Sequence, residues 1–225
     1  MSETRPEKPS SPFIYMILSG LGLLLMAVIA AWANFGVLEG MIVEGDTAAS
    51  FANIRDDEGQ FRLAILAFLI IALLDVIVAW SLNEVLRTRA RALSALAAAL
   101  RYVYAGILVI ATGFLLVAVQ LIARGSDDAD GLQLLLDGYE YTWDLGLLLF
   151  GCHLLVLGFA IEKAKIAKAW VGLGWIVMIA GAGYLFDAVA VVMYWDIGFE
   201  FAAFLFIGEV VLMGWLLWTG FRGKE

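Results

Sequence analysis

Long apolar runs, each close to the length of a membrane crossing, constrain the fold of this chain more than any other feature. The clearest lies within residues 138–160, where aromatic and acidic residues lead into the apolar run Leu145–Ala160. A helix of about 20 apolar residues spans the ~30 Å hydrocarbon core of a bilayer. Strands of an outer-membrane barrel would instead alternate apolar and polar residues. The sequence therefore predicts an all-α membrane protein.

Six such runs predict a six-transmembrane-helix bundle that forms a single domain over residues 13–221. The predicted crossings are Phe13–Val37, Phe61–Leu86, Ala92–Ala123, Leu132–Glu162, Ala169–Trp195 and Phe201–Phe221. Residues 1–12 are polar and contain all three prolines, so we expect a disordered leader. Residues 222–225 form a short tail.

The first run has an alternative interpretation as a secretory signal. Ala31-Trp32-Ala33 has the small-x-small form of a cleavage site. The apolar run is longer than the ~7–15 residues of a signal, however, and the leader carries Glu3 and Glu7 where a signal would be positive. A retained helix is the interpretation that we adopt.

A polar loop, Leu38–Gln60, follows the first crossing. Asp46 or Thr47 is suited to cap a short helix that ends near Arg55. Such a helix would present three apolar residues on one face: Ala48, Phe51 and Ile54. It would either lie on the membrane surface or serve as a solvated connector.

The basic residues predict the orientation of the bundle. Ten of the 14 fall in the termini and in the turns between crossings two and three and between crossings four and five. Three lie in the opposite loops, and Arg101 is intramembrane. Cytoplasmic segments of membrane proteins carry the excess of lysine and arginine. We therefore expect a multi-pass membrane protein with both termini in the cytoplasm.

Five ionisable residues fall within the predicted crossings: Asp75, Arg101, His153, Asp187 and Glu209. An unpaired charge at such depth costs several kcal/mol, and such residues mark functional sites by default. We expect Arg101 to pair with Asp75 across a short turn, with Tyr102 and Tyr104 in the same layer. His153 would connect this layer to Glu209. Because a histidine changes its charge near neutral pH, these groups are candidates for binding a ligand or relaying a proton.

A second, outer polar layer is expected around Asp187, with Tyr141, Asp144 and Tyr184. The plainer interpretation of the whole set is structural. In that case Arg101 and Asp75 form a clamp between helices, and His153 is a hydrogen-bonded core residue. The glycines of the fifth crossing are interpreted as close-packing positions.

The scarcity of cysteine and histidine excludes several kinds of site. The chain has one cysteine, Cys152, and one histidine, so an internal disulfide, a Cys/His zinc site and bis-histidine haem ligation within the chain are excluded. We predict no metal and no cofactor.

The net charge of −8 reflects acidic loops, and no nucleic-acid-binding motif is present. The expected partners are the lipid bilayer and a small-molecule ligand; the oligomeric state stays open.

Several segments resemble an uncharacterised bacterial membrane-protein family, the domain of unknown function 4386. They are VEGDTAASFANI followed by FRLAI, then LLDVIVAW, LRYVYAGIL, YTWDLGLLLFGCHLLVLGF and GAGYLFDAV. The resemblance covers nearly the whole chain after the leader. It implies a six-helix, multi-pass protein of the bacterial inner (plasma) membrane with no established activity. The positions to which it draws attention are Asp46, Asp75, Arg101, His153 and Asp187.

Three functions are consistent with these observations. The first is a membrane protein that binds or translocates a small molecule or a proton through a polar intramembrane cavity. The second is a non-catalytic membrane subunit or assembly factor, whose polar pairs fix helix register. The third is an intramembrane enzyme on a lipid-like substrate, with His153 as acid or base. Whether the protein is an enzyme stays open.

Overall fold

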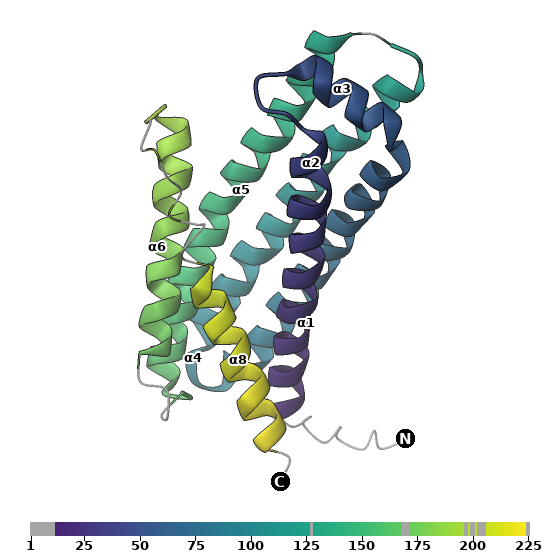
Figure 1. Cartoon of the computed structure of the whole chain (residues 1–225). Helices are drawn as coiled ribbons and strands as arrows, with labels where there is room; N and C mark the ends of the chain where they lie inside the picture. Colours follow the sequence, from purple (N-terminus) through teal and green to yellow (C-terminus); the bar gives the residue numbers. More distant parts are fainter. Residues whose placement is uncertain are drawn as a thin grey trace, which may run out of the picture.

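The computed structural model describes residues 12–126, 128–167, 172–195, 198, 201 and 206–223, and these form a bundle of helices without strands (Figure 1). The first helix, α1 (Pro12–Ala33), continues through a π-helical turn, η1 (Asn34–Leu38), into a short α2 (Glu39–Met41). The remaining helices are α3 (Thr47–Asp56), α4 (Glu58–Ala123), α5 (Ala129–Ala164), α6 (Leu173–Val192) and α8 (Ile207–Arg222). The predicted all-α class is confirmed.

Four segments are long and apolar enough to cross a membrane: Pro12–Met41, Glu58–Ala123, Ala129–Ala164 and Leu173–Val192. The chain is therefore compatible with a membrane from its first described helix to α6. The sixth predicted crossing corresponds to α8, which has 16 described residues. The predicted leader, apart from Pro12, and residues 224–225 of the tail lie outside the described residues.

The longest helix, α4, is bent at Ala90, whose backbone angles of φ −141° and ψ 45° are not helical. A straight helix would separate Asp75 from Arg101 by about 39 Å at 1.5 Å per residue. Instead, Arg101 Nη2 lies 2.7 Å from Asp75 Oδ1. The two halves of α4 therefore fold back on each other, and the bend falls inside the basic turn that the sequence predicts at Arg87–Arg91.

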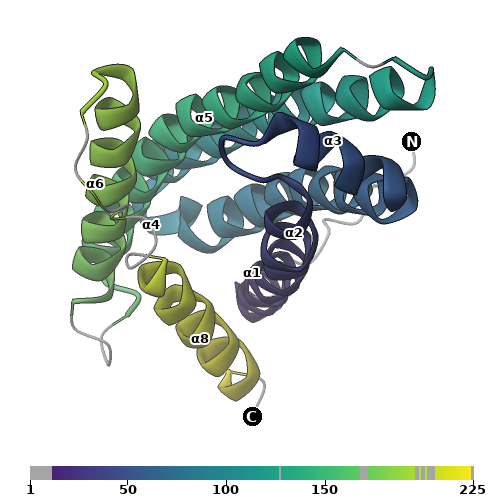
Figure 2. The same cartoon turned by 45° about the horizontal axis from the view of Figure 1, so that its top comes forward.

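Helix α5 lies between α4 and α6, and α1 packs against α4 and α8 (Figure 2). Glycines bring α5 and α6 into backbone contact. A Cβ atom on Gly158 would lie 2.4 Å from the Gly174 carbonyl oxygen, and one on Gly151 would lie 2.7 Å from that of Gly181. Only glycine permits such an approach. The interpretation of the glycines as close-packing positions is confirmed for Gly174 and Gly181, whereas a Cβ atom on Gly172 would meet nothing within 4 Å.

Aspartates cap the helices at the end of the bundle opposite the chain termini. Asp46 Oδ1 accepts a hydrogen bond from the Ala49 backbone N–H at 2.9 Å, as predicted for the start of α3. Asp57 and Asp128 cap α4 and α5 in the same way. A side-chain oxygen at this position satisfies a backbone N–H that has no partner within the helix.

Helix α3 covers this end of the bundle (Figure 1). Ile54 is fully buried and Phe51 nearly so, whereas Ala48 is exposed. The helix packs against α4 and α5, and Thr47 Oγ1 donates to Gln133 Oε1 at 2.6 Å. One face of this segment therefore packs against the protein, and its position at a membrane surface or in solvent stays a prediction.

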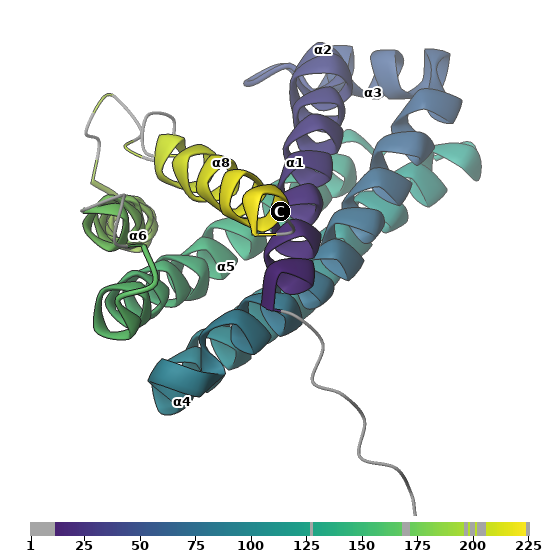
Figure 3. The same ribbon diagram turned by 90° about the horizontal axis from the view of Figure 1, so that it is seen from below.

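The apolar core forms two clusters along the bundle axis. One includes Phe61, Phe68 and Leu115, and the other includes Leu82, Leu157 and Trp215. Asp75 lies on α4 between the segments that contribute to the two clusters. The buried charges therefore occupy the middle of the bundle. Figure 3 views the molecule from the end where α1 begins, α4 bends and α8 ends.

Candidate functional site: a central polar cluster

The bend of α4 brings Asp75 and Arg101 into an ion pair inside the bundle. Arg101 Nε donates to Asp75 Oδ1 at 2.7 Å, and Nη2 lies equally close to the same oxygen. Each side chain is only 1% exposed. The pairing predicted from the sequence is therefore present. It removes the cost of leaving either charge alone in an apolar interior.

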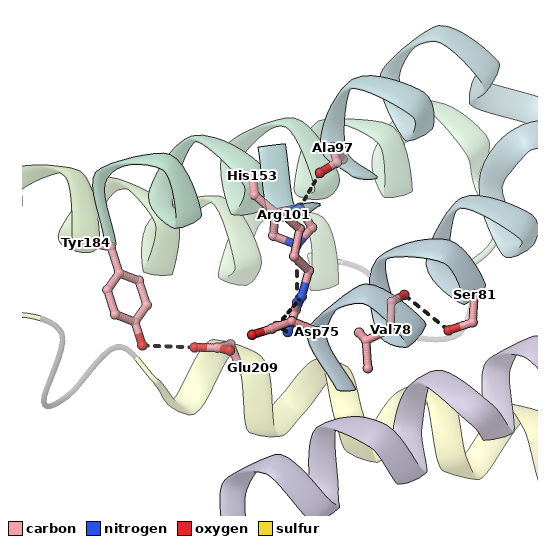
Figure 4. Close-up of polar contacts among 8 residues, drawn as sticks. All are labelled: Asp75, Val78, Ser81, Ala97, Arg101, His153, Tyr184 and Glu209. Atoms are coloured by element: carbon pink, nitrogen blue, oxygen red, sulfur yellow. Dashed lines mark hydrogen bonds and ion pairs between the residues drawn. The ribbon is translucent and has the colours of Figure 1, made fainter. Parts of the chain in front are cut away.

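His153, on α5, lies on the other side of Arg101 (Figure 4). Its Nδ1 lies 2.8 Å from the Ala97 carbonyl oxygen, and its Nε2 lies 3.3 Å from Arg101 Nη1. A carbonyl can only accept a hydrogen bond, and a guanidinium can only donate. The imidazole is therefore the neutral tautomer that carries its proton on Nδ1. His153 thereby ties α5 to the second half of α4.

Two polar atoms at the centre of the site have no hydrogen-bond partner among the described residues. These are Asp75 Oδ2 and Arg101 Nη2, and both are buried. Nη2 contacts Asp75 Oδ1, but not in hydrogen-bond geometry. Arg101 Nε and Nη2 both contact Asp75 Oδ1, so Asp75 Oδ2 remains available as an acceptor and Arg101 Nη2 as a donor, side by side. Buried polar atoms without a partner are uncommon in native proteins and call for a specific explanation.

Aromatic side chains surround the ion pair. The Arg101 guanidinium carbon lies 5.2 Å from the centroid of the Phe150 ring. Phe150 in turn contacts Tyr104 at 4.9 Å and Tyr184 at 5.4 Å between ring centroids. Tyr104, predicted in the same layer as Arg101, thus borders the cluster with its ring. Tyr102 is 39% exposed and points away from it.

A second hydrogen bond extends the polar site toward α8. The Tyr184 hydroxyl, on α6, donates to Glu209 Oε1, on α8, at 2.9 Å. Figure 4 shows the Glu209 carboxylate between Tyr184 and Asp75, and Glu209 interacts electrostatically with Arg101 and Asp75. We call Asp75, Arg101, His153, Tyr184 and Glu209 the central polar cluster. Glu209 therefore joins this layer through Tyr184 and Arg101, and not through a described contact with His153.

Two residues of the predicted outer layer, Tyr184 and Asp187, have described hydrogen-bond partners outside that layer. Tyr184 belongs to the central polar cluster instead. Asp187 Oδ1 accepts a hydrogen bond from the Phe201 backbone N–H at 3.1 Å, so its described role is to hold the chain segment between α6 and α8. Tyr141 is 53% exposed, and Asp144 is half-buried.

Sequence reasoning missed Tyr184 as a partner of Glu209, and it missed Phe150 altogether. For Tyr184, the sequence offered only helical spacing as a signal. Tyr184 lies three residues before Asp187, so the two side chains share nearly the same face of α6. Within the described residues, no group of three or more histidine, cysteine, aspartate or glutamate side chains could hold a metal ion.

Comparison with known proteins gives a family but no activity. The profile of the family described as "Domain of unknown function (DUF4386)" matches residues 18–220. An "Uncharacterized protein" from Archaeoglobus fulgidus is 30% identical over 162 residues, which cover 72% of this chain and 86% of the relative. No solved structure matches. The central polar cluster lies entirely within the matched region, and the chain belongs to the DUF4386 family.

Proposed function

We propose that this membrane protein binds a small polar molecule or a proton at the central polar cluster, and that it moves this ligand through the bundle. The observation that carries the proposal is the pair of buried polar atoms without a hydrogen-bond partner, Asp75 Oδ2 and Arg101 Nη2. An ion pair that served only to join helices would gain by using both carboxylate oxygens in a bidentate contact.

The chemistry of the cluster limits what it can bind. Asp75 Oδ2 accepts a hydrogen bond or a proton, and Arg101 Nη2 donates, so a ligand with both an acceptor and a donor fits. Glu209 is half-buried, whereas Asp75 and Arg101 are almost completely enclosed. A ligand would therefore reach the ion pair from the side of Glu209, with Tyr184 holding the Glu209 carboxylate in position.

The proposed topology has six crossings, with each half of α4 forming one and α8 forming the last. The protein would lie in the inner membrane of a bacterial cell. Both termini would be on the cytoplasmic side, with the leader at residues 1–12 and the tail at residues 222–225. The distribution of basic residues supports this orientation.

Reporter fusions after residue 225 test the proposed orientation. For a cytoplasmic C-terminus, alkaline phosphatase fused there should be inactive and a fluorescent protein should fluoresce. The opposite pattern would reject the proposed orientation.

Thermal unfolding of the purified protein in detergent tests the proposed function. A panel of small polar solutes, each measured across a range of pH, should contain a condition that raises the melting temperature of the wild type. Glu209→Gln should fold and lose that response, because its carboxylate forms the proposed entrance. Asp187→Asn is the matched control, since it changes an intramembrane acid outside the cluster, and it should keep the response. Equal responses in all three proteins would contradict the proposal.

The second candidate function is a non-catalytic membrane subunit. The observation that favours it is the near-complete burial of Asp75, Arg101 and His153, each 1% exposed. In that case the cluster would only fix the register of α4 and α5. Glu209→Gln would then change stability, and no solute would shift the melting temperature of the wild type.

A further inference from the structure

We infer that a basic, aromatic pocket at the end of the bundle where the chain termini lie binds the phosphate of an anionic phospholipid headgroup. The pocket has a volume of about 570 Å³, within the range of small-ligand sites. Three cationic side chains line it: Arg89 at the bend of α4, Lys165 at the end of α5, and Arg222 at the end of α8. It shares no residue with the central polar cluster.

Within the described residues, the three cations have no carboxylate partner of the kind that other basic side chains have. Arg62 pairs with Glu58, and Arg87 pairs with Glu84. No ion pair of this kind involves Arg89, Lys165 or Arg222 within the described residues, and no described acidic side chain lines the pocket. Three positive charges from separate helices thus converge on one space without a described acidic side chain beside them. Such an arrangement attracts an anion, and basic pockets between membrane helices bind lipid headgroups.

The local structure holds two of these cations in place. Arg89 Nη1 donates to the Ala164 carbonyl oxygen at 3.3 Å, at the last residue of α5. The Arg222 guanidinium lies 4.0 Å above the Trp218 ring centroid. Stacking on a ring leaves the N–H groups in the guanidinium plane able to contact a phosphate.

Lys165 is directed by an unusual backbone conformation. Its φ of 51° is left-handed, and it ends α5 as the C-cap residue. Glycine is the usual residue at such a position, because a side chain there is unfavourable. The presence of lysine places a third charge at the pocket at a conformational cost.

The apolar surroundings favour a lipid over a free phosphate ion. Trp215 and Phe13 line the pocket, and the exposed side chains of Trp218 and Phe221 lie on the same end of α8. Tryptophan is enriched at the level of lipid headgroups in membrane proteins. The pocket therefore combines a cationic site for a phosphate with an apolar edge for acyl chains.

Thermal unfolding in a neutral detergent tests this inference with three probes: dioctanoyl phosphatidylglycerol, dioctanoyl phosphatidylcholine and inorganic phosphate. The anionic lipid should raise the melting temperature of the wild type, and the effect should weaken at high salt. Phosphatidylcholine should have a much smaller effect at the same concentration. An equal effect of phosphatidylcholine, or of inorganic phosphate alone, would overturn the inference, because the site would then not select an anionic lipid.

Lys165→Gly is the most informative variant, because glycine suits the left-handed backbone and the fold should be retained. We expect the affinity for the anionic lipid to fall about fivefold, from the loss of one cationic contact. Arg222→Gln should act in the same direction. The matched control is Lys163→Gln, which removes an exposed charge from the same turn but not from the pocket. Equal affinities of Lys165→Gly, Lys163→Gln and the wild type would reject the site.

Discussion

Helix α5 is held by two neighbours in two different ways. Toward α4 it presents His153, which hydrogen-bonds to Arg101 and to the Ala97 carbonyl. Toward α6 it presents Gly151 and Gly158, which allow backbone contact with facing glycines. One interface is specified by charge and hydrogen bonding, and the other by shape. In a membrane, where lipid is as apolar as the side chains, these are the two available means of selecting a helix partner.

The largest effect should come from breaking the polar interface at its centre. Arg101→Ala would leave Asp75 buried without a counter-charge, which costs about 3–5 kcal/mol of stability. Reversible unfolding in mixed detergent measures this loss. The double variant Asp75→Ala with Arg101→Ala should be less destabilised than Arg101→Ala alone. If removing both charges is as harmful as removing one, the ion pair does not explain the loss.

The glycine interface should be the next most sensitive. Gly158→Ala would place a methyl group 2.4 Å from the Gly174 carbonyl oxygen, and the helices would have to separate. We expect a cost of about 1–3 kcal/mol in the same unfolding experiment. Gly106→Ala is the control, because a Cβ atom there meets nothing within 4 Å. Equal stability of the two variants would show that the α5–α6 contact is looser than described.

His153→Phe keeps an aromatic ring but removes both hydrogen bonds of the polar interface. We expect a loss of about 1–2 kcal/mol, smaller than that for Arg101→Ala, because the ion pair with Asp75 would remain. Nitrogen NMR of labelled wild-type protein gives an independent check. It should find the proton on Nδ1, and a proton on Nε2 alone would contradict the described hydrogen bonds.

The smallest effect is expected between α6 and α8, where the Tyr184 hydroxyl donates to Glu209 while its ring packs against Phe150 of α5. Tyr184→Phe removes one hydrogen bond and should cost about 0.6 kcal/mol, the average for such bonds between membrane helices. The change should not weaken the α5–α6 contact. Cross-linking efficiency between cysteines introduced on α5 and α6 should therefore equal that of the unsubstituted background.

The ion pair and the helix cap could be predicted from the sequence, because a buried charge and a free helix N-terminus each have few possible partners. A buried arginine needs an acid, and Asp75 lies just across a short basic turn from Arg101, so that pairing could be derived. The cap at Asp46 follows from the same kind of argument. The rotation of each helix could not be derived. Tyr102 is exposed while Tyr104 is buried, yet the surrounding residues are apolar on every face and carry little directional signal.

The partners of Tyr184 and the basic pocket were also beyond sequence reasoning. Both depend on where α8 lies relative to α6, α1 and the bend of α4, which are distant in the chain. The positive charges of the pocket could be recognised only as markers of orientation. Their convergence on one space requires the bend of α4 and the ends of α5 and α8 to lie at the same end of the bundle.

The bend at Ala90 also has a consequence for biosynthesis. Arg101 belongs to a segment that a translocation machinery would insert at a cost of several kcal/mol if it entered the bilayer alone. In the proposed six-crossing topology, the bend places Asp75 beside Arg101, so the two halves of α4 can enter as a hairpin whose charges neutralise each other. Asp75 precedes Arg101 in the chain, so the acid is already synthesised when the arginine reaches the bilayer. A single non-helical residue thus makes a strongly charged segment compatible with stepwise membrane insertion.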